Sequence, residues 1–96
     1  MYKLKIGGHT FDIIQAVLKD DLAETDFDTA RITLHSLSTR TIKESSLIHE
    51  ILHVLNPTMD STDDGHRILE SLSEQLYQVF RDNLLINFDS VLGRDN

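Results

Sequence analysis

Residues 46–55 read SLIHEILHVL, and this stretch decides how the rest of the chain is organised. Its apolar residues recur at helical spacing, which predicts an amphipathic helix over residues 38–55. Thr41 and Glu44 have capping-box spacing near its start, and Pro57 disfavours helical backbone at the residue before it. Polar side chains in so apolar a helix indicate burial on both sides, and buried polar groups need partners.

The same helix carries an H-E-x-x-H motif, formed by His49, Glu50 and His53. At about 100° per residue the two histidines lie one turn apart on one face, so both imidazoles can reach one ion at about 2.0–2.1 Å. Glu50 is offset by one residue, where it can accept a proton from water without ligating the metal. The alternative is an exposed His and Glu face without a metal.

The N-terminal third, residues 1–35, has the patterns of a sheet. Residues 2–6 alternate between apolar and polar, and Gly7-Gly8 suits a tight turn into a second strand over residues 9–18. The end of that strand is expected to be buried on both sides. Weaker strand patterns at 22–27 and 30–35 predict a second hairpin. We therefore expect a small antiparallel sheet of three to four strands.

A second helix is expected over residues 62–83, with an apolar stripe at helical spacing. The stripe consists of Ile68, Leu69, Leu72, Leu76, Val79 and Phe80. Residues 84–96 read as a tail, of which Leu84, Leu85, Ile86 and Phe88 could pack back on the domain. The sequence thus predicts a single α+β domain over residues 1–96, with the sheet followed by two antiparallel helices.

A third metal ligand is expected from the second helix, because catalytic zinc sites of this kind add one residue to the two histidines. Glu70 is our first choice and His66 is its rival; the one that does not ligate could orient His49 or His53. Tyr77 follows on the same side of the helix and could donate a hydrogen bond to an oxyanion, or be a half-buried aromatic residue with a wet hydroxyl. His35 is expected at a strand end, as a partly exposed residue or at the rim of the site.

Charge and composition limit the partners of the chain. Nine Lys and Arg against sixteen Asp and Glu give a net charge of −7, which argues against nucleic acid and anionic lipid. Five of the acids lie within residues 20–28, where a solvated loop is expected and a surface for a basic partner is the alternative. Without cysteine, any metal must take nitrogen and oxygen ligands. With no apolar run of about 18 residues and no signal sequence, we expect a cytoplasmic protein without a membrane span.

Three stretches, residues 46–53, 68–72 and 76–83, resemble small phage-encoded zinc metallopeptidases, and residues 22–34 are similar to the sheet of those proteins. More distantly the chain is similar to ImmA/IrrE-type peptidases and minimal gluzincins. The resemblance implies a zincin-like fold, bound zinc, Glu50 as the base and Glu70 as the downstream ligand. It departs at His66, where the phage proteins often carry an acid, so that the choice between Glu70 and His66 stays open.

The expected function is therefore zinc-dependent hydrolysis of peptide bonds, with Glu50 as general base and a protein or peptide as substrate. The alternative is a non-catalytic phage regulatory or binding protein on a metallopeptidase scaffold with a structural or vestigial metal site. A metal-free α+β interaction domain is a third possibility. The sequence does not predict the oligomeric state.

Overall fold

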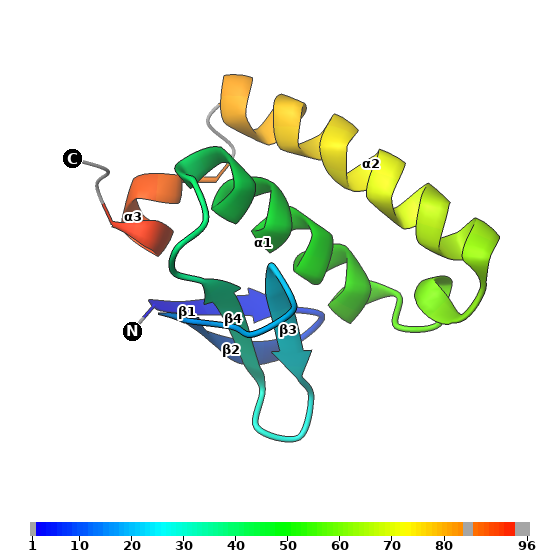
Figure 1. Ribbon diagram of the computed structural model, residues 1–96, viewed down its shortest axis with the longest axis horizontal. Helices are drawn as coiled ribbons and strands as arrows, with labels where there is room; N and C mark the ends of the chain where they lie inside the picture. Colours follow the sequence, from blue (N-terminus) through cyan, green and yellow to red (C-terminus); the bar gives the residue numbers. More distant parts are fainter. Residues whose placement is uncertain (1, 84–85, 94–96) are drawn as a thin grey trace.

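The computed structural model describes residues 2–83 and 86–93 and has an α+β architecture, a four-stranded sheet followed by two main helices (Figure 1). The elements in chain order are β1 (Tyr2–Ile6), β2 (His9–Ala16), β3 (Ala23–Asp26), β4 (Arg31–His35), α1 (Arg40–Leu55), the short 3-10 helix η1 (Met59–Ser61), α2 (Asp63–Asp82) and α3 (Phe88–Leu92). The predicted order of sheet, motif helix and second helix is confirmed.

The sheet is mixed, which corrects the prediction of an antiparallel sheet. Both expected hairpins are present, since β1 pairs antiparallel with β2 and β3 pairs antiparallel with β4. The strand order is β1-β2-β4-β3, and β2 and β4 run parallel, with Ile13 opposite Ile32. Alternation along a strand predicts which residues face the core, but it carries no information about which strand lies next to which.

Residues 17–22, which we call the crossing loop, connect β2 to β3 past the C-terminal end of β4. This follows from the register, in which His35 at the end of β4 lies opposite Ala16 and Leu34 lies opposite Ala23. The expected strand over residues 9–18 is therefore two residues too long. Val17 is 67% exposed, so the prediction that this end is buried on both sides is wrong.

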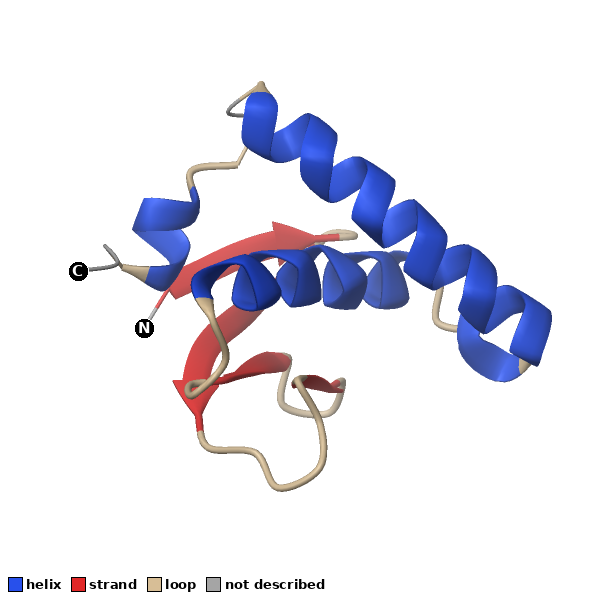
Figure 2. Cartoon of the chain, turned by 45° about the horizontal axis from the view of Figure 1, so that its top comes forward, coloured by secondary structure: helices blue, strands red, loops and turns tan. Residues whose placement is uncertain are grey.

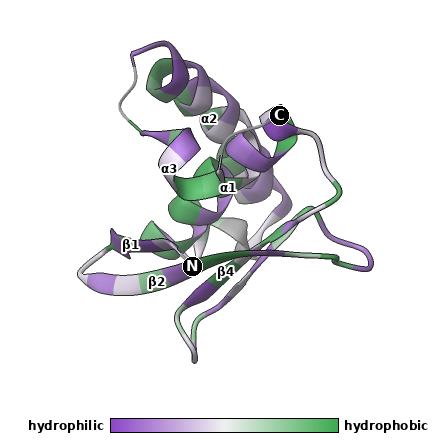
Figure 3. Cartoon of the chain, turned by 90° about the vertical axis from the view of Figure 1, so that its left-hand side faces the viewer, coloured by the Kyte–Doolittle hydropathy of each residue, from purple (hydrophilic) through white to green (hydrophobic). Residues whose placement is uncertain are grey.

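Helix α1 lies between the sheet and α2, and α2 runs back across it (Figures 1 and 2). One face of the sheet is covered by α1 (Figure 3), whose Leu47 and Ile48 are buried, whereas Ile42 and Leu55 at its two ends are exposed. This placement explains why the helix is apolar on more than one side. The buried core comprises a cluster of Ile6, Phe11, Ile13, Ile32, Leu34, Leu47, Ile48, Phe88 and Val91, together with Leu69 of α2.

The first turn of α1 differs from the predicted capping box. Thr39 is the N-cap, and its hydroxyl accepts a hydrogen bond from the backbone N–H of Ile42. Glu44 is therefore one turn inside the helix and is only 8% exposed. It accepts hydrogen bonds from Arg40 Nε at 2.8 Å and from the Tyr77 hydroxyl at 2.6 Å. A carboxylate at this depth needs both partners to offset its lost hydration.

Part of the expected tail forms α3, which packs against the domain. Phe88 and Val91 are buried, and Ile86 is packed against the core, as expected for residues 86 and 88; Leu84 and Leu85 lie outside the described residues. Arg40 fastens this segment, because its guanidinium donates to Asp89 at 2.8 Å and to the Gly93 carbonyl oxygen. Within residues 2–83 and 86–93, none of the helices combines the length and the hydropathy that crossing a bilayer requires.

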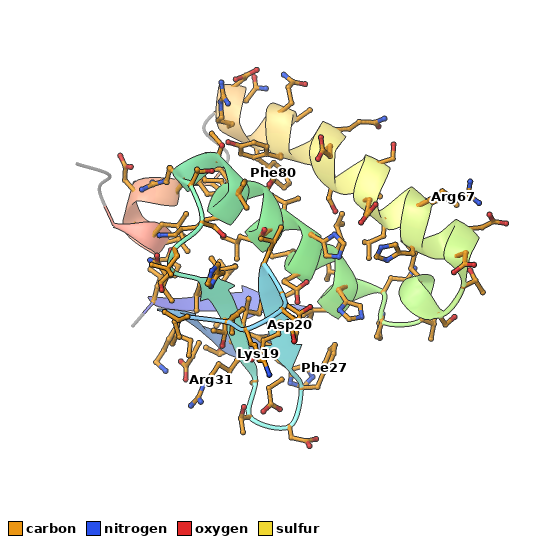
Figure 4. All side chains as sticks on the ribbon, viewed as in Figure 1. Lys19, Asp20, Phe27, Arg31, Arg67 and Phe80 are labelled. Atoms are coloured by element: carbon orange, nitrogen blue, oxygen red, sulfur yellow. The ribbon has the colours of Figure 1, made fainter. Side chains whose placement is uncertain are left out.

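The other face of the sheet carries a row of alternating charges across all four strands. Lys3, Asp12, Arg31 and Asp26 lie opposite one another in register, and the side chain of Arg31 points away from the helices (Figure 4). Lys3 donates a hydrogen bond of 2.6 Å to Asp12, and this contact lowers the pKa of the Asp12 carboxyl. These opposite charges across neighbouring strands fit a face that remains in water.

Candidate functional site

A groove of about 520 Å³ lies where the crossing loop and the start of β3 meet α1 and α2. Three parts of the chain contribute its walls. The lining residues are Asp20, Asp21, Leu22 and Ala23 from the loop and strand, Ser45, Ser46, His49 and Glu50 from α1, and His66, Glu70, Ser73 and Glu74 from α2. The groove therefore contains four of the six residues that the sequence singled out for chemistry.

Glu50 is the most deeply placed carboxylate of this groove. It is 6% exposed, and its Oε1 accepts a hydrogen bond of 2.6 Å from the Thr25 hydroxyl of β3. Its other oxygen, Oε2, lies 4.0 Å from His49 Nε2. The edge strand thus fixes one oxygen of Glu50 and leaves the other beside the imidazole of the preceding residue.

His49 and His66 face each other across the two helices. Their ring centroids are 6.2 Å apart in an edge-to-face arrangement. His66 Nε2 also lies 3.0 Å from Glu70 Oε1, one turn further along α2. Since both of these α2 side chains are about half exposed, their ion pair adds little to stability. The His66 and Glu70 side of α2 was expected to meet the face of α1 that carries His49 and His53; the structure brings His66 to His49 alone.

His53 is not among the residues that line the groove. Its ring packs edge-on against Phe27, with the centroids 5.8 Å apart. Phe27 follows β3, and Figure 4 shows its side chain below the C-terminal half of α1. The two imidazoles of the H-E-x-x-H motif therefore have different partners: His49 contacts α2, whereas His53 contacts the turn between β3 and β4.

Tyr77 lies outside the lining of the groove, at the other end of the contact between α1 and α2. Its hydroxyl donates to Glu44, and its ring packs edge-on against Phe88 at 5.9 Å. Burial and the neighbouring Glu44 carboxylate raise the pKa of the Tyr77 hydroxyl. Glu44 was not a predicted site residue; its spacing of four from Arg40 was the available signal, and this spacing also fits an ordinary surface pair.

The donors that face the groove are suited to zinc in kind, since they are imidazole nitrogens and carboxylate oxygens. Two imidazoles that share a tetrahedral zinc have ring centroids about 5 Å apart, given zinc–nitrogen distances of about 2.0–2.1 Å. The 6.2 Å between His49 and His66 is close to that value. In the described part of the chain, however, no set of three or more His, Asp or Glu side chains is arranged to hold an ion.

Asp20 and Asp21 are acidic lining residues that the sequence did not connect with the site. The acidic stretch was predicted to be a solvated loop, and both side chains are exposed, yet they border the groove. No local sequence pattern could reveal that Asp20 and Asp21 border the groove. Their position depends on β4 lying between β2 and β3, because the crossing loop then has to pass the end of β4 to reach β3.

Comparisons with known proteins leave the family open: no family model, no curated protein and no solved structure matches the chain.

Proposed function

We propose that the groove is the active site of a zinc-dependent peptidase in which Glu50 is the general base. The observation that carries the proposal is the convergence of His49, His66 and Glu70 on one groove beside a buried Glu50. These groups come from two separate helices, and a purely structural domain has no need to gather them at one surface. Acids and bases that converge on one groove, with one carboxylate buried beside them, mark a candidate catalytic site.

In this proposal the metal is held by His49, His53 and one group of α2, either Glu70 or His66. The side chain of His53, which packs against Phe27, would have to take another orientation to join the other ligands. When bound, zinc supplies a Lewis acid that polarises a peptide carbonyl and lowers the pKa of water to about 7.

Glu50 is suited to move the proton. Thr25 holds Oε1, so Oε2 is the oxygen that takes the proton of the attacking water and delivers it to the leaving amine nitrogen. The hydroxyl of Thr25 also fixes the orientation of the carboxylate, so that less entropy is lost in the transition state. Thr25 acts through Glu50 and is a positioning residue.

The substrate backbone can be held by β3. This strand is at the edge of the sheet and borders the groove through Ala23, its first residue. An edge strand has unpaired N–H and C=O groups that pair with an extended peptide by strand addition. A groove of this size takes a few residues of an extended chain, which favours an unfolded segment or an exposed loop as the substrate.

Metal analysis of protein purified without added metal tests the first half of the proposal. We expect about one zinc per chain in the wild type, and loss of zinc from His49→Ala and from His53→Ala. Glu70→Ala and His66→Ala identify the third ligand, because only the variant of the ligand loses zinc. A wild-type protein that contains no zinc and gains none by dialysis contradicts the proposal.

Cleavage of fluorescein-labelled casein tests the second half. Glu50→Gln should keep its zinc and lose at least about 100-fold in kcat, the usual contribution of a general base. Asp82→Asn at the exposed end of α2 is the matched control and should cleave like the wild type. Cleavage by Glu50→Gln at the wild-type rate would remove Glu50 as the base.

One observation favours a second function, a binding protein without catalysis. The lining of the groove includes five carboxylates and no Lys or Arg, and His53 is engaged with Phe27. A zinc-free or zinc-loaded wild type that binds a basic polypeptide without cleaving any casein would favour this function over the peptidase.

A further inference from the structure

The crossing loop forms one wall of the groove without any regular structure of its own. Asp20, Asp21 and Leu22 line the groove, and none of them belongs to a helix or strand. Irregular segments are normally the most mobile parts of a surface. The position of this wall therefore depends on the contacts that fasten the two ends of the loop.

His35 fastens both ends. Its Nδ1 atom accepts a hydrogen bond of 2.9 Å from the backbone N–H of Leu18, and its own backbone N–H donates to the carbonyl oxygen of Leu22 at 2.9 Å. The next residue, Ser36, donates its N–H to Ala16 at the end of β2, also at 2.9 Å. Hydrogen bonds from the end of β4 thus hold both ends of the crossing loop.

The two hydrogen bonds of His35 differ in what they require from its side chain. The bond to Leu22 uses the backbone and can be made by any residue except proline. The bond from Leu18 needs an acceptor at the Nδ1 position, and an imidazole can supply it only when Nδ1 carries no proton and Nε2 carries the hydrogen. The Leu18 N–H is partly buried, so an absent acceptor is not fully replaced by water.

We propose that His35 is a positioning residue of the groove: through Nδ1 it fixes the crossing loop and thereby the wall formed by Asp20, Asp21 and Leu22. This rests on the groove being the proposed substrate site, although the hydrogen bond between Leu18 and His35 can be tested without any activity. His35 is not among the lining residues of the groove, so it acts on the shape of the site and takes no part in bond breaking.

A pair of substitutions separates Nδ1 from the rest of the ring. In His35→Asn the side-chain oxygen occupies the place of Nδ1, whereas in His35→Gln it occupies the place of Nε2. Amide hydrogen exchange at Leu18 is the readout. We expect exchange to be about 10-fold faster in His35→Gln, and Asn to restore the wild-type rate within about 3-fold, as for loss and recovery of one hydrogen bond.

His9→Gln is the matched control, because His9 is exposed at the start of β2 and its substitution should leave Leu18 unchanged. The amide shifts of Asp20, Asp21 and Leu22 should move in His35→Gln and return in His35→Asn. Equal exchange rates at Leu18 in the Asn and Gln variants would overturn the proposal. If His35→Gln does not fold, nitrogen NMR spectra of the His35 imidazole in the wild type decide. A hydrogen on Nε2 supports the bond from Leu18 to Nδ1, and a hydrogen on Nδ1 overturns it.

Casein cleavage separates the positioning role of His35 from the proposed peptidase activity. A wall that orients the substrate predicts a KM raised about 10-fold in His35→Gln, with kcat within about 2-fold of wild type and recovery in His35→Asn. Wild-type protein that cleaves nothing refutes the peptidase and leaves the exchange result to decide the role of His35. Wild-type cleavage with an unchanged KM in His35→Gln refutes the positioning role alone.

Discussion

Thr25 and Glu50 are joined by a hydrogen bond of 2.6 Å, although one belongs to the edge strand β3 and the other to the middle of α1. The bond joins β3 to α1, two of the elements that contribute residues to the groove. It also gives a partner to a carboxylate that is only 6% exposed. The stability of the domain and the geometry of its groove are therefore linked at this contact.

Thr25→Val should lower the free energy of unfolding by about 1–3 kcal/mol, because it leaves a buried carboxylate oxygen without its donor. Thr25→Ser keeps the hydroxyl and should lose less than half as much. Urea unfolding at neutral pH, followed by circular dichroism, gives both values. If Thr25→Ser is destabilised and Thr25→Val is not, the methyl group of Thr25, which valine keeps, rather than its hydroxyl holds β3 to α1.

Tyr77→Phe should lower the free energy of unfolding by about 1–3 kcal/mol at neutral pH, since Glu44 loses a hydrogen-bond donor. The pH dependence has a definite sign. The folded state raises the pKa of Tyr77 above its ordinary value of 10.0, so its contribution is complete below pH 10.0 and is lost as the pH rises through the folded value.

Thermal unfolding, measured from pH 8 upward into the alkaline range in steps of about half a pH unit, gives this dependence. The difference in stability between wild type and Tyr77→Phe should shrink as Tyr77 ionises. Tyr2 offers the control, because Tyr2→Phe removes the only other tyrosine of the chain and should not abolish that shrinkage. A difference that stays constant at high pH would exclude Tyr77 as the titrating group.

Asp26→Asn should weaken the turn between β3 and β4 in a pH-dependent way. Asp26 Oδ1 accepts the backbone N–H groups of Asp28 and Thr29, and these bonds lower the pKa of its carboxyl from 3.8. The stabilisation by the charged form is present above the unfolded value and disappears as the pH falls through the folded one. Asn keeps the oxygen but not the charge.

The unfolding midpoints of wild type and Asp26→Asn should therefore differ at pH 6 and converge as the pH falls below the ordinary carboxyl value of about 3.9. The carboxyl carbon shift of Asp26 in a titration reports its pKa directly. A midpoint difference that persists in acid would show that the substitution acts through packing and not through charge.

Gly65→Ala should destabilise the start of α2. A Cβ atom at this position would lie 1.8 Å from the backbone oxygen of Met59 in η1, so the 3-10 helix and α2 would have to move apart. We expect a loss of about 1–3 kcal/mol in the free energy of unfolding. Ser71→Ala, on the exposed side of the same helix, should change it by less than about 0.5 kcal/mol.

The elements themselves could be predicted from the sequence because each depends on local patterns. Alternation gave the two hairpins, and helical spacing with Pro57 gave a motif helix that ends at Leu55 as expected. The parallel pairing of β2 with β4 could not be predicted, because strand neighbours are chosen by contacts between segments far apart in sequence. The prediction of zincin-likeness stays a prediction.

The candidate site, too, was predictable from the sequence only in part. His49, Glu50, His66 and Glu70 share one groove because the short connection between the helices places α2 back on α1. The contact of His53 with Phe27 depends on where the hairpin turn of β3 and β4 falls, and that position follows from the sheet order. The role of His35 at the crossing loop has the same origin.

The position of β4 has a consequence for how the chain acquires its structure. β4 is the last strand to be synthesised, yet it occupies an interior place between two strands that precede it. A nascent chain that ends before residue 31 can form its first hairpin but cannot complete the sheet. Closing this gap is a non-local step, and such steps slow folding. The groove can exist only after this insertion, so every folding intermediate without β4 lacks the site.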